Sequence, residues 1–178
     1  MSPLLSFAVL LAMRDVNGVE RQPLHVDSGK ANILFFITNE CPISNAFARE
    51  IARICADYSS KGFGCDLVYA DASITDVQAR QHAQEFGHGD YPRLVDRKHE
   101  LVKAAGVTVT PEAAVINREG KVVYRGRIDD SFAALGQPRR AVKNADLRAA
   151  LDAVAVGRQV ETPVTKALGC YISDLAAH

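Results

Sequence analysis

The sequence predicts an α/β domain with a central mixed sheet, helices on both faces of the sheet and a C-terminal tail. Residues 33–37 form a continuous apolar run, as expected of a strand that is covered on both faces, and residues 63–70 read as a second inner strand. Each is followed by a segment with helical spacing of apolar residues, and this alternation is typical of βαβ units with parallel strands. Residues 113–117 and 121–125 flank a tight turn, so an antiparallel hairpin joins the same sheet.

The remaining elements follow from local signals along the chain. An Asn-Gly turn at Asn17 and Gly18 predicts a short hairpin near the start. Gly106 is placed to end a helix in the left-handed conformation, and Ser73 is a candidate helix cap. The expected elements are a helix from residue 41 to about 58, a helix over 73–86, a short strand over 93–96, a helix over 99–105 and a final helix from about 145.

The size and charge of the chain limit its domain number and its partners. A chain of 178 residues that is 48% hydrophobic can build one domain with a full core, but it is too short for two comfortable domains. Lys plus Arg and Asp plus Glu number 21 each, so no overall field attracts nucleic acid or anionic lipid. We therefore expect one domain over residues 14–158, a tail over 159–178, no nucleic-acid partner and no membrane span.

The first segment, residues 1–13, is apolar and has the length of a signal peptide, but it is far too short to cross a bilayer. It lacks a basic start and a clean cleavage site, so a first strand or a packed helix is the alternative. We favour an exported or periplasmic location over a cytoplasmic one on this evidence.

Cys41 is the strongest candidate for a reactive group. It follows the strand at 33–37 and precedes the helix, so it lies at a strand-to-helix turn. Unpaired N–H groups at a helix N-terminus stabilise negative charge and can lower a thiol pKa from about 8.5 to between about 3.5 and 7.5. A small buried hydrophobic residue, the commonest role of a free cysteine, would leave this placement unexplained.

Four cysteines allow three complete pairings, which helix length and strand direction narrow down. A continuous helix would separate Cys41 from Cys55 by about 20 Å, beyond the reach of a disulfide. Cys65 opens the next parallel strand at the opposite edge of the sheet from Cys41. Cys41 with Cys170 remains, with or without a bridge between Cys55 and Cys65. For these two we expect packed core thiols, because both lie on apolar faces.

Three signatures resemble the thioredoxin-like superfamily and, within it, the redoxin branch that includes AhpC/TSA and TlpA-type proteins. Cys41 in residues 36–44 matches the family's nucleophile, and Thr110-Pro111 in residues 106–112 matches its cis-proline loop. The third signature is the hairpin ending at residues 123–130. The resemblance covers residues 15 to about 157 and implies a thioredoxin-like fold, with Pro111 in cis beside Cys41.

Departures from the family pattern bear on mechanism. Ser44 stands where thioredoxins carry the second cysteine of C-x-x-C, so no neighbouring thiol can resolve a mixed disulfide. Thr38 matches the threonine of the peroxiredoxin pattern, but Leu34 stands where its proline belongs. The arginine of peroxiredoxins has no clear match, and Arg125 or Arg127 are the candidates to replace it.

The resemblance implies a thiol-disulfide oxidoreductase in which Cys41 attacks and Cys170 resolves; a free thiol or a structural anchor is the alternative role for Cys170. A thiol peroxidase with antioxidant activity through a Cys41 sulfenic acid and a non-catalytic binding module are the alternative functions. The expected substrate is a thiol, a disulfide or a peroxide, and the expected electron source is an external thiol reductant. The catalytic candidates are Cys41, Cys170, Thr38 and Ser44, and the substrate-binding candidates are Thr110, Pro111, Pro42 and Asn45.

We expect no cofactor and no metal. The five histidines have no ligand spacing typical of a metal site, and surface positions are expected for them. The run from Thr38 to Pro42 also resembles copper-delivering Sco proteins, but Asn45 stands where their second cysteine would be.

Overall fold

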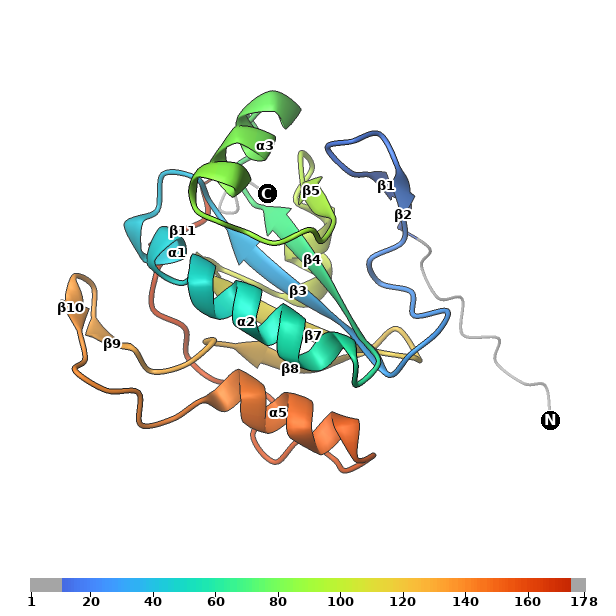
Figure 1. Ribbon diagram of the computed structural model, residues 1–178, viewed down its shortest axis with the longest axis vertical. Helices are drawn as coiled ribbons and strands as arrows, with labels where there is room; N and C mark the ends of the chain where they lie inside the picture. Colours follow the sequence, from blue (N-terminus) through green and yellow to red (C-terminus); the bar gives the residue numbers. More distant parts are fainter. Residues whose placement is uncertain (1–10, 174–178) are drawn as a thin grey trace.

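The computed structural model of the protein describes residues 11–173, and its centre is a five-stranded mixed sheet (Figure 1). The strand order is β5-β4-β3-β7-β8, with β3, β4 and β5 parallel to one another and β7 antiparallel to both β3 and β8. This confirms the predicted α/β architecture. The strands span β3 Ala31–Ile37, β4 Phe63–Tyr69, β5 Arg93–Val95, β7 Glu112–Asn117 and β8 Val122–Gly126.

Helices cover both faces of the sheet, because the inner strands carry apolar side chains on both sides. In β3, Ile33, Phe35 and Ile37 join one core cluster and the alternate residues Leu34 and Phe36 join the other. All five are fully buried, and burial of each such side chain contributes about 1.5–3 kcal/mol to folding. The helices are α1 Pro42–Ala46, α2 Ala48–Ser59, α3 Asp76–Glu85, α4 Glu100–Ala105 and α5 Asp146–Ala155.

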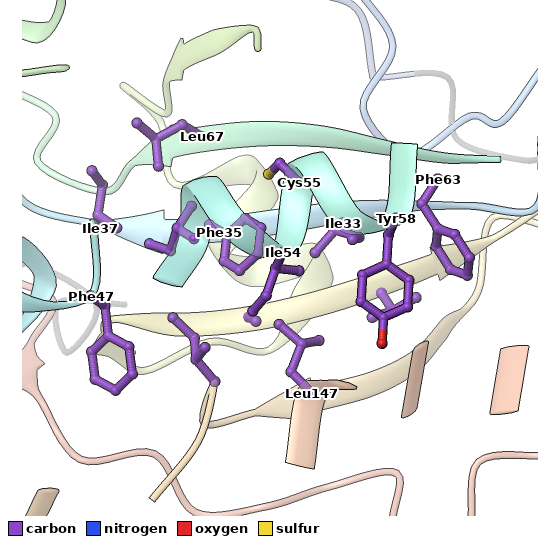
Figure 2. Packing of buried hydrophobic residues seen from close by; sticks show 14 of the residues in the cluster. Ile33, Phe35, Ile37, Phe47, Ile54, Cys55, Tyr58, Phe63, Leu67 and Leu147 are labelled. Carbon is purple, nitrogen blue, oxygen red and sulfur yellow. The ribbon is translucent and has the colours of Figure 1, made fainter. Parts of the chain in front are cut away.

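The larger cluster lies under α2 and α5, and α4 covers the opposite face. Figure 2 shows Ile54 of α2 and Leu147 of α5 in the larger cluster with the side chains of β3. Leu101 and Val102 of α4 belong to the second cluster. Among the residues described, no helix is long and apolar enough to span a membrane.

Within residues 11–173, six short strands lie outside the main sheet and form three pairs. The Asn17-Gly18 turn joins β1 Met13–Arg14 to β2 Glu20–Arg21, which confirms the first hairpin. The sequence did not indicate the other two pairs. These are β9 Phe132–Ala134 with β10 Gln137–Pro138, and β6 Val109–Thr110 with β11 Cys170–Tyr171.

Two helix boundaries differ from the prediction. The helix expected over residues 41–58 is interrupted at Phe47, which ends α1 and starts α2. The N–H of Phe47 reaches the carbonyls of both Ile43 and Ser44, as in a tightened last turn. The cap of α3 is Thr75 rather than Ser73, because Thr75 forms a reciprocal capping box with Gln78.

The expectation of two unpaired core thiols at Cys55 and Cys65 was wrong: they form a disulfide, with their α-carbons 5.9 Å apart. Helix α2 packs across β4, so a cysteine near its end meets a cysteine near the start of the strand. An apolar face favours a buried thiol, but it does not show which residue lies opposite.

The prediction of an export segment at residues 1–13 falls largely on residues 1–10, outside the described part of the chain. Of the described residues, Leu11 and Met13 are partly buried against the second core cluster.

The tail beyond α5 runs along β8 and then crosses to β6. Thr165 donates its N–H to the carbonyl of Arg125 in β8, and its hydroxyl lies 2.7 Å from the Tyr124 hydroxyl. Further on, Ile172 is buried in the second core cluster. The tail is therefore an integral part of the packed domain up to residue 173.

Candidate functional site

Cys41 lies between the end of β3 and the start of α1, which confirms the predicted strand-to-helix turn. It is the N-cap of α1, and its N–H donates to the carbonyl of Thr38 at 3.3 Å. Pro42 occupies the first helical position, where its missing N–H leaves no hydrogen bond unmade. Cys41 is only 2% exposed, although its side chain borders a cavity.

The cis-proline loop packs directly against this cysteine. The Thr110–Pro111 bond is cis, as the sequence predicted, and the Cys41 Sγ donates to the Thr110 carbonyl at 3.3 Å. The hydroxyls of Thr38 and Thr110 lie 3.1 Å apart, so a second contact joins the two loops. Thr110 and Pro111 are buried, and Thr38 is half-buried.

Cys170 reaches the same place from the tail. In the antiparallel pairing of β11 with β6, Cys170 lies opposite Thr110, the residue whose carbonyl accepts from Cys41. Cys41 and Cys170 are the two free cysteines of the described residues. The chain thus brings together two thiols that are 129 positions apart in sequence (170 − 41).

The two thiols differ in their ionisation. Burial opposes ionisation of Cys41, but hydrogen bonds to the thiolate from Cys170 and from the N–H and hydroxyl of Ser44 outweigh it and hold the Cys41 pKa below its ordinary value. Burial raises the pKa of Cys170 to about 11, and the neighbouring Cys41 adds to this effect. Cys41 therefore loses its proton more readily than Cys170 does.

Ser44 has a position suited to this ionisation. Its side chain is buried, and its Oγ has no hydrogen-bond partner among the described residues in the reduced site. The proton of the Cys41 thiol is directed at Thr110, so the serine hydroxyl gains an acceptor only when Cys41 becomes a thiolate. An otherwise unpaired buried hydroxyl therefore favours the charged state of the cysteine.

Asn45 and Pro42, which are also in α1, have surroundings that differ from those of Ser44. The Asn45 amide donates to the Asn39 carbonyl at 3.0 Å, and its oxygen lies 2.8 Å from Nε2 of His82, which must donate. His82 Nδ1 in turn lies 2.9 Å from the Tyr69 hydroxyl. Both polar groups of Asn45 thus hold the loop before Cys41 to α3, whereas Pro42 is exposed on the surface.

A cavity of about 430 Å³ opens beside the two thiols. Its lining contains Asp71, His99 and Tyr171, which the sequence analysis did not single out. Asp71 follows β4 as Cys41 follows β3, and residues that follow neighbouring parallel strands meet at one edge, so this signal was present in the sequence. The lining residues are Thr38, Asn39, Glu40, Cys41, Ala70, Asp71, Ala72, Ser73, His99, Cys170, Tyr171 and Ser173.

The expected surface positions of the histidines were wrong for three of the five. His82, His88 and His99 are buried and have hydrogen bonds to Asn45, Tyr91 and Ala70, respectively. The described residues contain no cluster of three or more potential metal ligands. His178 lies outside those residues.

The two candidate arginines are committed elsewhere. Arg125 donates to the Gly106 carbonyl, and Arg127 pairs with Asp146 at 2.6 Å. Neither contributes to the cavity beside Cys41, and within residues 11–173 no arginine or lysine lines that cavity.

Comparison with known proteins identifies the family. The Redoxin family profile matches residues 15–137, more than half of the chain. The chain belongs to the Redoxin family. No curated protein matches it.

Solved structures agree with this assignment. An uncharacterized conserved protein from Geobacillus kaustophilus is 30% identical, with a TM-score of 0.79 over 93% of this chain and 88% of that one. A hypothetical protein from Sinorhizobium meliloti is 28% identical, with a TM-score of 0.75 over 93% and 91%. A secreted disulfide oxidoreductase of Mycobacterium tuberculosis is 16% identical, with a TM-score of 0.52 over 64% and 80%, and this distant likeness shows the thioredoxin-like fold alone.

Proposed function

We propose that this redoxin is a thiol-disulfide oxidoreductase in which Cys41 is the nucleophile and Cys170 is the resolving thiol. The observation that carries the proposal is the pairing of Cys170 with Thr110, which brings the second thiol to Cys41 although the neighbouring position is Ser44. The opposite pKa directions of the two thiols support the division of roles.

The proposed reaction has two exchange steps. The Cys41 thiolate attacks one sulfur of a disulfide RSSR, the S–S bond breaks, and one thiolate RS⁻ leaves while a mixed disulfide forms on Cys41. Cys170 then loses its proton and attacks the Cys41 sulfur, which forms the Cys41–Cys170 disulfide and releases the second thiol. An external dithiol returns the pair to the reduced state. Thiol-disulfide exchange of this kind needs an attacking thiolate, and the lowered pKa of Cys41 supports that role.

The other candidate residues have supporting roles in this proposal. Ser44 stabilises the Cys41 thiolate, Thr38 holds the nucleophile loop to Thr110, and Asn45 positions that loop. Thr110 and Pro111 form the floor against which the reacting sulfurs align, and exposed Pro42 starts the helix that presents Cys41.

Two alternatives are less well supported. A thiol peroxidase would need a cationic group beside the sulfur to orient and polarise a peroxide, and the described cavity lining holds no arginine or lysine. A binding module without turnover would leave the opposite ionisation of the two thiols without a purpose.

The Cys55–Cys65 disulfide is typical of oxidising compartments and favours export.

A turnover assay tests the proposal. We expect the protein to accelerate reduction of hydroxyethyl disulfide by dithiothreitol and the Cys41→Ser variant to lose this activity. Without dithiothreitol, which would itself reduce a mixed disulfide, we expect hydroxyethyl disulfide to leave a mixed disulfide on Cys41 of the Cys170→Ser variant. Equal activity of wild type and Cys41→Ser would contradict the proposal, and faster consumption of hydrogen peroxide than of any disulfide would favour the peroxidase alternative.

A further inference from the structure

Strand β6 includes Thr110, whose carbonyl accepts from Cys41, and the protein's own tail is paired with this strand. Among the described residues, β6 pairs with β11 alone, in the register Thr110 opposite Cys170 and Val109 opposite Tyr171. An extended partner chain binds such an edge by adding a strand and using its unpaired N–H and C=O groups. In this protein, the backbone groups of β6 face β11, which already pairs with them.

Gly169 fits the tail closely against the cis-proline loop. A β-carbon at this position would lie 2.0 Å from the Thr110 oxygen and 2.6 Å from the Thr110 carbonyl carbon. No side chain can occupy that space without moving the tail or the loop, because both neighbours are backbone atoms. The close approach of tail to loop thus depends on a glycine at the residue just before Cys170.

A second glycine and a buried side chain secure the tail on either side of this contact. A β-carbon on Gly126 of β8 would lie 2.1 Å from Thr165 Oγ1 and 2.5 Å from the Thr165 carbonyl oxygen. Beyond Cys170, Ile172 is 6% exposed in the second core cluster, and its N–H donates to the Thr108 carbonyl at 3.2 Å. Cys170 is held between two anchored points.

The tail also decides what can reach the nucleophile. With the tail docked, Cys41 is 2% exposed and is approached through the cavity of about 430 Å³, one wall of which is formed by Cys170, Tyr171 and Ser173 of the tail. A volume of this size fits a small molecule rather than a folded protein or an extended chain.

We propose that the disulfide attacked by Cys41 is a low-molecular-weight disulfide that enters this cavity, and that the docked tail keeps extended protein chains off the β6 edge. The inference rests on the thiol-disulfide exchange proposed above and names its substrate class. The first exchange takes place inside the cavity, and the second uses Cys170, which the tail already holds opposite Thr110. The two exchange steps are those of the proposed reaction, and an external dithiol is the reductant.

Two disulfides with the same small thiol as leaving group test the substrate class. One is hydroxyethyl disulfide, which is uncharged and so is not repelled by Glu40 and Asp71 at the cavity. The other is an extended peptide whose single cysteine carries a mixed disulfide with mercaptoethanol. The rate of Cys41 oxidation by each is measured by quenched-flow mass analysis. For the wild type we expect the small disulfide to react at least about tenfold faster, because few molecules have the tail released.

The Ile172→Ala variant loosens the tail without replacing a cysteine or a residue of the cis-proline loop. We expect the peptide rate to rise about tenfold as the released fraction grows, while the rate with hydroxyethyl disulfide changes much less. Hydrogen exchange of residues 169–173 confirms the release. Val164→Ala is the matched control, since Val164 belongs to the same tail, is 57% exposed and has no part in the cavity. Gly169→Ala gives a second variant, whose added β-carbon overlaps the Thr110 backbone and so disfavours the docked position of the tail.

The outcomes separate this inference from the proposed function. Equal wild-type rates with the two disulfides, or a released tail in Ile172→Ala with no gain in peptide rate, would overturn the substrate class and leave exchange at Cys41 intact. Absence of reaction with both disulfides would instead overturn the proposed function.

Discussion

Cys170 lies opposite Thr110 in the antiparallel pairing of β11 with β6, and the Thr110 carbonyl accepts the hydrogen bond of the Cys41 thiol. One residue of the cis-proline loop thereby links Cys41 to Cys170 near the other end of the chain. Ser44 stands where a C-x-x-C site holds its second cysteine, and the second free thiol near Cys41 comes from the tail.

We predict that Ser44→Ala raises the pKa of Cys41. The variant removes a hydroxyl that donates to the thiolate, and a hydrogen bond to a charged group contributes about 1.5–3 kcal/mol, so the pKa of Cys41 should rise toward its ordinary value. Ultraviolet absorbance of the thiolate against pH measures it. The absorbance of the wild type should rise in two steps as the pH increases. The first step, from Cys41, should lie below the ordinary pKa of a thiol, and the second, from Cys170, should lie near pH 11. Ser60→Ala, at an exposed serine beyond α2, is the control, and an unchanged first step in Ser44→Ala would remove Ser44 from the site.

The Cys170→Ala variant should raise the Cys41 pKa as well and should stop the reaction at the first exchange. It removes the thiol that donates to the Cys41 thiolate, and it leaves no second cysteine near the mixed disulfide. The expected product after treatment with hydroxyethyl disulfide is a stable adduct on Cys41, seen as a mass gain of the intact protein. Full turnover by this variant would show that an external thiol resolves Cys41.

The Cys55–Cys65 disulfide should stabilise the fold without taking part in exchange. It closes a loop across a sequence separation of 10, and the chain-entropy model assigns about 3 kcal/mol to a loop of this length. The double variant Cys55→Ala and Cys65→Ala should therefore lose about that much free energy of unfolding in urea titration. Oxidation of Cys41 by hydroxyethyl disulfide should keep its rate, and a large loss of that rate would mean that the bridge supports the site.

Buried His88 should make the protein less stable in mild acid. Burial lowers its pKa in the fold from 6.5 to about 4, aided by His82 and Arg93, so below pH 6.5 the unfolded chain binds a proton that the folded chain refuses. The contribution of neutral His88 to the free energy of unfolding is therefore fully present above pH 6.5. As the pH falls from 6.5 toward about 4, this free energy decreases by about 1.4 kcal/mol per pH unit. Comparison of the urea stability of wild type and His88→Gln between these pH values isolates this contribution. If the free energy of unfolding depended on pH equally in the two proteins, this prediction would be contradicted.

Much of the fold could be predicted because its signals are local. The apolar run ending at Ile37, the Asn17-Gly18 turn and the left-handed Gly106 each specify a short stretch of chain, and the structure has the corresponding strand, hairpin and helix end. The placement of Cys41 and the cis bond before Pro111 were predicted in the same way, the second through family resemblance.

The remaining features depend on contacts between distant parts of the chain. The bridge from Cys55 to Cys65 depends on how α2 crosses β4, and the burial of His82 depends on the packing of α3 against Tyr69 and Asn45. Strand β11 has two residues, and nothing in its own sequence marks it as a strand. Gly169 is informative only once its neighbour, the Thr110 carbonyl, is known.

Peptide mapping without reduction, after one equivalent of hydroxyethyl disulfide, tests the pairing of Cys41 with Cys170 most directly. We expect a cross-linked peptide that contains Cys41 and Cys170, two released mercaptoethanol molecules per protein, and an unchanged Cys55–Cys65 bridge. An oxidised protein with mercaptoethanol retained on Cys41 and a free Cys170 thiol would contradict it.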